Sequence, residues 1–176
     1  MHILPSSLDL AAAELEISDK KGRESILKNA LLPIKQYYDY IIIDCPPSLG
    51  LITTNALTAS DTFLVPIQCE YYALEGLTQL MSTVRRIKRQ YNNTIDIEGV
   101  LLTMYDGRLN LTQQVVEEVK KFFPRKVFKT VIPRGVRLSE APSFGMPVIY
   151  YDKNCKGSIT YTELAKEIIA KERSYE

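Results

Sequence analysis

The feature that most constrains the fold is an apolar run that ends abruptly in a carboxylate and two prolines. Tyr40 and the isoleucines at 41–43 are followed by Asp44 and, two residues later, by Pro46 and Pro47. A short, unbroken apolar run is typical of a parallel strand that is buried on both faces. Proline donates no backbone hydrogen bond and has a fixed φ, so the two prolines end the strand. We therefore expect a buried strand that carries Asp44 at its carboxyl end.

Asp44 has two interpretations at this position. Ligands of open α/β sheets bind beyond the carboxyl ends of the strands. A carboxylate at such a strand end can hold Mg²⁺ through water, because Mg²⁺ keeps most of its waters and takes few protein ligands. Alternatively, Asp44 only caps the helix that is expected to begin near Leu51.

The remaining sequence alternates between strand and helix patterns. Further strands are expected at residues 1–4, 62–67, 97–104, 127–132 and 147–150. Helices are expected at residues 8–17, 22–37, 51–60 and 74–91, from 110 to 122, and from 160 onward. Pro33 should kink or shorten the second of these helices. The alternation predicts an α/β fold with a mainly parallel sheet flanked by helices, as a single domain over residues 1–176.

Charge is distributed unevenly along the chain. Residues 85–137 contain 12 Lys and Arg against 5 Asp and Glu, whereas residues 1–84 contain 5 against 10. Between Val119 and Ser139 there are seven basic residues and no acidic one, which predicts a surface for an anionic partner. A second basic group ends the helix expected at 74–91 and consists of Arg85, Arg86, Lys88 and Arg89. Cations suit the C-terminal end of a helix dipole, so a solvated helix end is the plainer interpretation of that group.

Composition narrows the classes of function. No apolar run approaches the roughly 20 residues that span a bilayer. Cys45, Cys69 and Cys155 are widely spaced, which indicates reduced thiols and neither a disulfide framework nor a zinc site. The single histidine, His2, lies at the N-terminus, so a histidine-based catalytic site is not expected.

Four stretches, in the same order, resemble ParA/Soj-type partition ATPases of the MinD-like P-loop group. They are YDYIIIDCPPS at 38–48, PIQCEYYALEGL at 66–77, LTMYDGRLNL at 102–111 and IPRGVRLSEAPSFG at 132–145. The first matches the Walker B/switch II segment of that family, and the resemblance extends over nearly the whole chain. It implies a P-loop NTPase-like fold.

The phosphate-binding motif of that family, G-x-x-x-x-G-K-[ST], does not occur in this sequence. The stretch CKGS at 155–158 contains Lys, Gly and Ser, but in the wrong order and without the leading glycine. By the resemblance, the P-loop strand and its phosphate loop would precede Met1, and the chain corresponds to the C-terminal two-thirds of the family. The missing strand would lie between the Asp44 strand and the strand at 62–67, so both would lack backbone partners.

The resemblance also implies residues of a nucleotide site. Asp44 would be the catalytic residue and would hold Mg²⁺ through water. Met104 and Pro133 would flank the adenine of ATP with apolar contacts, although ordinary packing at strand ends explains both residues equally well. Arg134 would serve either nucleotide or DNA.

Arg108 and Arg137 match positions that bind DNA in the family. Both are expected in loops at strand ends, and neither fits an apolar stripe. Arginines there would neutralise phosphates and release counterions, so binding would not depend on sequence and would fall steeply with salt. The patch could be extended by Lys120, Lys121, Arg125, Lys126 and Lys129.

These observations leave three hypotheses about function. In the first, the protein in its complete form is a partition ATPase of chromosomes or plasmids. It binds ATP with Mg²⁺, forms a homodimer, holds DNA non-specifically in the cytoplasm at the nucleoid, and is stimulated by a ParB/Spo0J-like partner. In the second, the chain is a truncated, non-enzymatic remnant that binds DNA or a partner. The third, a MinD-like membrane-surface switch, is disfavoured because residues 165–176 mix both charges.

Overall fold

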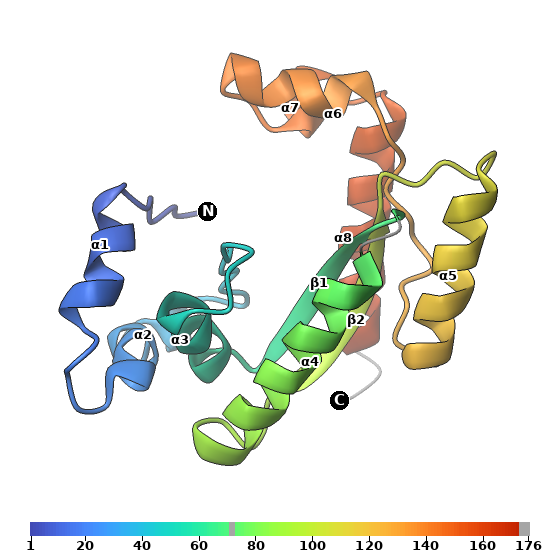
Figure 1. Ribbon diagram of the computed structural model, residues 1–176. Helices are drawn as coiled ribbons and strands as arrows, with labels where there is room; N and C mark the ends of the chain where they lie inside the picture. Colours follow the sequence, from blue (N-terminus) through green and yellow to red (C-terminus); the bar gives the residue numbers. More distant parts are fainter. Residues whose placement is uncertain (71–72, 173–176) are drawn as a thin grey trace. The chain divides into compact units, whose positions relative to one another are not determined.

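The computed structural model describes residues 1–70 and 73–172, and the chain divides into two compact units (Figure 1). The first unit comprises residues 1–63 and 79–96, and the second comprises residues 64–78 and 97–176. Tyr71 and Tyr72, which belong to the matched stretch at 66–77, lie outside the described residues.

The first unit is helical. Its elements are α1 (Asp9–Glu16), η1 (Arg23–Ser25), α2 (Ile26–Leu31), η2 (Lys35–Tyr37), α3 (Leu51–Ala59) and the second half of α4 (Ala73–Gln90). The helix expected at 22–37 is thus split into short pieces. Pro33 lies in the turn between α2 and η2, where its ring prevents the helix from continuing, as predicted.

An apolar cluster holds α3 and α4 together in this unit. Leu57 of α3 packs with Val84 and Ile87 of α4 and with Ile95, all of them buried, and Phe63 and Leu80 border them. Val84 and Ile87 are three positions apart, so they share one face of the helix. The polar face of α4 is consequently left on the outside of the unit.

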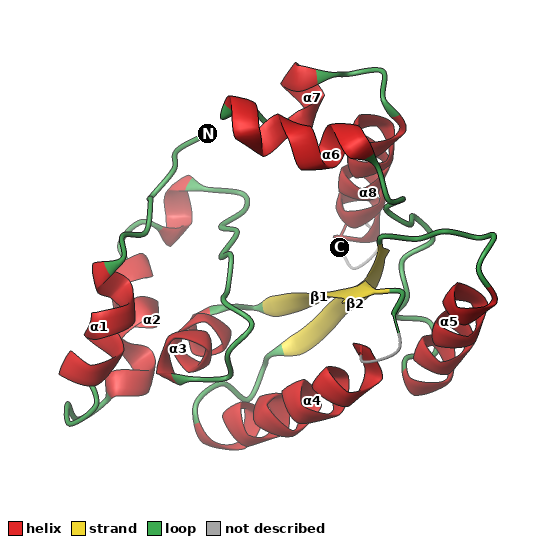
Figure 2. Ribbon diagram, turned by 45° about the horizontal axis from the view of Figure 1, so that its top comes forward, coloured by secondary structure: helices red, strands yellow, loops and turns green. Residues whose placement is uncertain are grey.

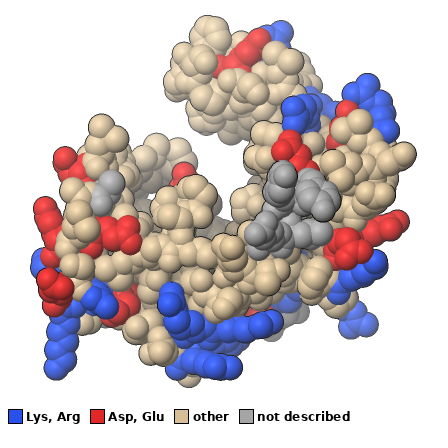
Figure 3. All heavy atoms as spheres, viewed as in Figure 1, with Lys and Arg blue, Asp and Glu red and all other residues tan. Residues whose placement is uncertain are grey.

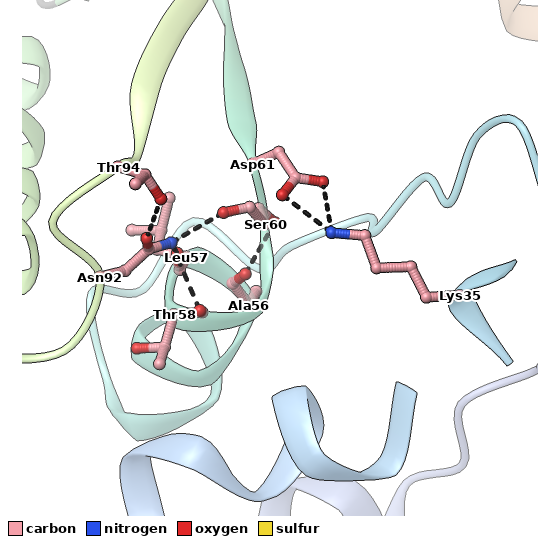
Figure 4. A network of polar contacts seen from close by, with 8 residues as sticks. All are labelled: Lys35, Ala56, Leu57, Thr58, Ser60, Asp61, Asn92 and Thr94. Carbon is pink, nitrogen blue, oxygen red and sulfur yellow. Dashed lines mark hydrogen bonds and ion pairs between the residues drawn. The ribbon is translucent and has the colours of Figure 1, made fainter. Parts of the chain in front are cut away.

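Asn92 ties the end of α3 to the turn after α4 (Figure 4). Its side-chain amide donates to the carbonyl oxygens of Leu57 at 3.0 Å and Ser60 at 2.7 Å, and its own oxygen accepts a hydrogen bond from the Thr94 hydroxyl at 2.9 Å. These carbonyls lie at or beyond the C-terminal end of α3, where no intrahelical N–H reaches them. The buried Asn92 amide therefore takes the place of a helix cap.

The expected strand at 40–43 is not formed, and the prediction of a strand there was wrong. In the part of the chain that the structure describes, residues 40–48 carry no strand, and the Ile42 side chain is 91% exposed. A strand is stable only when neighbouring strands accept and donate its backbone hydrogen bonds, and no described strand lies beside this segment. The apolar run has the composition of a central strand, but the described residues provide no neighbouring strands for it.

The second unit contains the sheet (Figure 2). β1 (Thr62–Gln68) and β2 (Asp96–Thr103) pair side by side, and α4 connects them. The segment after Lys126 extends the sheet in parallel through two isolated bridges, Val100 to Val127 and Tyr105 to Pro133. The strands expected at 62–67 and 97–104 are confirmed.

The strand expected at 127–132 is interrupted by a side chain of the last helix. Phe128 and Ile132 donate backbone hydrogen bonds to β2 at 3.0 and 2.9 Å. Between them, the N–H groups of Lys129 and Thr130 both donate to the Glu167 carboxylate, at 2.7 and 2.9 Å. Successive N–H groups of a regular strand point in opposite directions, so two neighbours that reach one carboxylate break the ladder.

Helices complete the second unit. They are α5 (Asn110–Phe122), α6 (Val136–Glu140), η3 (Ala141–Phe144), α7 (Val148–Tyr151) and α8 (Lys156–Glu172). The strand expected at 147–150 is wrong, because Pro147 instead starts the short helix α7. The last helix begins at Lys156, four residues before the start expected at residue 160.

The core of the second unit joins the sheet to α8. Leu101, Phe128, Ile132 and Leu164 are buried together, and Ile168 packs against them. The α/β class with a parallel sheet flanked by helices is therefore confirmed. No helix among the described residues is long and apolar enough to cross a membrane.

Candidate functional site

An open cleft of about 770 Å³ lies in the second unit, beyond the carboxyl end of β2. The residues that line it come from the turn after β2, from the extended segment before α6 and from the first turns of α8. They are Tyr105, Asp106, Gly107, Arg108, Lys129, Thr130, Val131, Pro133, Arg134, Lys156, Thr160 and Glu163. The edge of a sheet at which parallel strands end is where α/β proteins place their ligands.

Backbone hydrogen bonds bring the two loops of the cleft together. Tyr105 donates to the carbonyl of Ile132 at 3.0 Å, and Arg134 donates to the carbonyl of Tyr105 at 3.4 Å. Met104, just before this pairing, has a φ of 49°. This left-handed conformation is uncommon for a residue other than glycine and turns the chain out of the strand. Met104 and Pro133 therefore lie close to each other at one end of the sheet.

Arg108 points back onto its own turn. Its guanidinium donates to both carboxylate oxygens of Asp106, at 2.9 and 2.7 Å. These hydrogen bonds, together with one from the Arg108 backbone N–H, lower the pKa of Asp106 from 3.8 to about 2. Asp106 is therefore charged throughout the physiological range and offsets the charge of Arg108.

Arg134 is also paired with a carboxylate. It donates to Glu70 at 3.0 Å and lies 3.8 Å from the Met104 sulfur. Both charged side chains are more than half exposed, so the pair contributes little to stability. In this pair, the Arg134 guanidinium lies beside Met104, just after the carboxyl end of β2.

Arg137 does not line the cleft. It lies in α6, where it donates to Glu140 at 2.9 Å and approaches Asp152 at 3.6 Å. Its guanidinium also lies 5.9 Å from the centre of the Tyr151 ring, within the range of a cation–π contact. The hydrogen bond and charge of Glu140 raise the pKa of Arg137. The two arginines that resemble DNA-binding positions are thus held by separate carboxylates.

Lys129 and Lys156 complete the cationic lining, and sequence reasoning missed Lys156 as a site residue. Four lining residues are Lys or Arg and two are Asp or Glu, so the cleft is suited to an anionic ligand such as phosphate. In the sequence, Lys156 stands out only as part of the CKGS stretch, which does not match the phosphate-binding motif. Lys156 reaches the cleft because α8 begins at this residue. The helix was expected to begin only at residue 160, so Lys156 was not placed at its start.

Asp44 belongs to the first unit, where it is exposed in an irregular segment. It does not cap α3: the N-cap is Gly50, without a side-chain hydrogen bond, and the first N–H, that of Leu51, donates to Glu14 instead. The alternative interpretation of Asp44 as a helix cap is therefore wrong. The strand that was expected to present Asp44 is the one that does not form.

Comparison with known proteins identifies the family. A sequence family described as an AAA domain matches residues 1–97. Over 170 residues, the chain is 59% identical to the sporulation initiation inhibitor protein Soj of Bacillus subtilis, covering 97% of this chain and 67% of that protein. The chain belongs to the ParA/Soj family. It is also 51% identical to the chromosome partitioning protein ParA of Myxococcus xanthus, over 98% of this chain and 61% of that protein.

A solved structure shares the fold of this ParA/Soj chain. It is cobyrinic acid a,c-diamide synthase from Mycobacterium smegmatis with bound ADP and magnesium. The TM-score is 0.82 at 34% sequence identity, over 98% of this chain and 63% of that one. The chain thus spans about two-thirds of the length of the relatives that it matches.

The residues of this chain do not form a complete site for Mg²⁺ and ATP. The sequence contains no G-x-x-x-x-G-K-[ST] motif, whose backbone amides, Lys and Ser/Thr hold the phosphates and the metal. Within the described ranges, no group of three His, Cys, Asp or Glu side chains could hold a metal ion. The exposed Asp44 carboxylate could meet Mg²⁺ through water, but the phosphate side is not supplied.

Proposed function

We propose that this protein acts in DNA partition and binds duplex DNA through the phosphate backbone, without sequence preference. The observation that carries the proposal is the cationic cleft beyond β2, in which Arg108, Arg134, Lys129 and Lys156 converge. Phosphates would replace Asp106 and Glu70 as the partners of Arg108 and Arg134, because guanidinium groups bind carboxylate and phosphate in the same geometry. Membership of the ParA/Soj family supports the assignment.

For ATP, the chain contains residues that could contact the adenine, but its sequence has no motif that binds the phosphates. Met104 and Pro133 lie at one strand end, where they could contact an adenine, and Arg134 lies beside Met104. Asp44 would act on Mg²⁺ and the attacking water only in a protein that also holds the phosphates. In that complete form the protein would hydrolyse ATP, form a homodimer and respond to a ParB/Spo0J-like partner at the nucleoid in the cytoplasm.

A second candidate function is a non-enzymatic one, in which the chain binds DNA or a partner and hydrolyses nothing. The specific observation in its favour is the segment at 40–43, which forms no strand and leaves Ile42 almost fully exposed. A catalytic carboxylate needs a fixed position relative to phosphate. Asp44, on an irregular exposed segment, does not have that support within the described residues.

Fluorescence anisotropy with a labelled duplex and a sequence-scrambled duplex tests the DNA-binding proposal. Arg108→Ala combined with Arg134→Ala should weaken binding to both duplexes equally and make the dependence on salt shallower by about 1 for each arginine that contacts phosphate. The matched control, Lys20→Ala with Lys21→Ala, removes two exposed cations from the first unit and should leave binding unchanged. Equal effects of both pairs would show that only net charge matters and would refute the proposed site.

A further inference from the structure

A second basic surface lies on α4 in the first unit. Five polar side chains follow one face of the helix and line a shallow hollow of about 300 Å³. They are Ser82, Arg85, Arg86, Arg89 and Gln90, here called the α4 stripe. Their spacing of three, four, seven and eight positions from Ser82 places them on neighbouring turns of one face. Figure 3 shows Lys and Arg side chains gathered over the region where α4 ends in Figure 1.

The core of the unit fixes the direction in which the stripe points. Val84 and Ile87 alternate with the arginines along the helix and are 5% and 0% exposed. They pack against Leu57 and Ile95, so the helix cannot turn about its axis without breaking the apolar cluster. The three arginines, all exposed, are therefore presented to solvent on a rigid backbone.

The cations of the stripe have no carboxylate partner among the described residues. The sequence contains four basic residues and no acidic one between Glu75 and Asp96. Among the described residues, no ion pair joins a carboxylate to Arg85, Arg86 or Arg89, whereas Arg108, Arg134 and Arg137 each have one. In the cleft beyond β2, an anionic ligand must displace the carboxylates that pair with Arg108 and Arg134. An anion can bind the arginines of the α4 stripe without displacing a carboxylate.

The helix dipole does not account for the whole stripe. Lys88 and Arg89 lie in the last turn of α4, where cations interact favourably with the unpaired carbonyls. That effect falls off within one turn, yet Arg85 and Arg86 stand a turn earlier and add two more like charges. Repulsion among these neighbouring cations costs stability unless an anion binds them.

We propose that the α4 stripe is a second nucleic-acid contact, which binds the phosphates of a DNA duplex. This inference rests on the proposed DNA-binding function. Arg85 and Arg89 are one helical turn apart, about 6 Å along the axis, which is close to the rise of about 7 Å over two nucleotides of one strand. Guanidinium groups bind phosphate oxygens in pairs, and Ser82 and Gln90 add uncharged donors. Contacts to phosphate carry no sequence information, so binding through the stripe should be independent of sequence.

Salt titration of DNA binding by the full chain tests the inference. Arg85→Gln with Arg89→Gln should reduce the slope of log K against log [salt] by about 1 for each arginine, equally for the labelled duplex and its scrambled form. Arg85→Lys with Arg89→Lys keeps the charges and should restore most of the slope. The control pair Lys20→Gln with Lys21→Gln should not change it, and thermal melts of all variants should coincide with that of the unsubstituted chain.

The outcomes separate this inference from the proposed function. Unchanged binding after the α4 substitutions, with reduced binding after Arg108→Ala and Arg134→Ala, would overturn the proposal for the α4 stripe and support the cleft as the DNA contact. Reduced binding after the α4 substitutions, with unchanged binding after the substitutions in the cleft, would support the α4 stripe and refute the cleft as the DNA contact. If neither duplex is bound by the unsubstituted chain, both proposals fail. Binding of the stripe to phosphatidylglycerol vesicles in preference to the duplex would also overturn the nucleic-acid assignment, because it would identify a membrane surface as the ligand.

Discussion

Arg108 donates to both carboxylate oxygens of Asp106, at 2.9 and 2.7 Å, within a single turn after β2. The arginine that we propose as a DNA contact is therefore already paired with a carboxylate two positions before it. Because the pKa of Asp106 is lowered to about 2, the carboxylate stays ionised at every pH at which DNA binding is measured. A DNA phosphate would therefore have to compete with Asp106 for Arg108.

Asp106→Asn should accordingly strengthen DNA binding. The substitution removes the competing negative charge, so Arg108 becomes available to phosphate, and the salt slope should become steeper by about 1. Fluorescence anisotropy over a series of salt concentrations measures this change. Asp19→Asn, an exposed acidic position of the first unit, makes the same change in net charge and should have a much smaller effect. Weaker binding by Asp106→Asn would mean that Asp106 positions Arg108 for DNA and does not mask it.

Glu167→Gln should destabilise the chain in a way that depends on pH. Burial opposes ionisation of Glu167, but hydrogen bonds from the N–H groups of Lys129 and Thr130 outweigh it, and the pKa lies below its usual value of 4.5. A carboxylate whose pKa is lowered by folding adds stability above its unfolded pKa, and that stability is lost as the pH falls through the folded value. The substitution should cost about 1–2 kcal/mol near neutral pH.

Chemical denaturation at several pH values measures the effect of Glu167→Gln. The difference from the unsubstituted chain should shrink as the pH falls below about 4.5. Glu163→Gln, an exposed position of the same helix, removes the same charge without backbone partners and serves as the control. A difference that stays constant down to the acid limit would show that the hydrogen bonds to Lys129 and Thr130 do not depend on the carboxylate charge.

Asn92→Ala should destabilise the first unit more than any nearby polar substitution. The Asn92 amide donates to the carbonyls of Leu57, Thr58 and Ser60 at 3.0, 3.3 and 2.7 Å. Alanine would leave these acceptors without the donor in a buried site, at a cost of about 2–3 kcal/mol. Asn93→Ala changes the exposed neighbour and should have little effect on a urea melt. Equal destabilisation by both substitutions would contradict a capping role for Asn92.

Local patterns predicted the elements whose neighbours lie close by in the sequence. The strand at 62–67 and the helix at 74–91 were found because their partners, β2 and α3, are in the chain. The Ile41–Ile43 strand was not formed, because its pattern required neighbours that the described residues do not contain. The sequence pattern shows that these isoleucines are suited to a buried strand. It does not show whether neighbouring strands are present to bury them.

The candidate site was also predicted in part. Arg108, Pro133 and Arg134 were proposed from the resemblance to the ParA/Soj family, and the structure brings them to one cleft. Lys156 was missed because its role depends on where α8 begins. The interruption of the strand at 127–132 depends on Glu167, a residue nearly forty positions away. Neither contact leaves a periodic signal in the sequence.

The chain by itself should neither bind Mg-ATP tightly nor hydrolyse ATP. Met104 and Pro133 are proposed to contact the base, but the sequence contains no G-x-x-x-x-G-K-[ST] motif to hold the phosphates, and phosphoryl transfer depends on positioning the phosphates and stabilising their charge. A ligand at a hundred times its Kd would stabilise the folded state by about 2.7 kcal/mol, so a thermal melt with and without Mg-ATP detects binding, with Mg²⁺ alone as the control. Phosphate release measures hydrolysis. A melt raised by Mg-ATP, together with hydrolysis that Asp44→Ala abolishes and Asp39→Ala does not, would show that the pocket is complete without that motif and that Asp44 is catalytic in this chain.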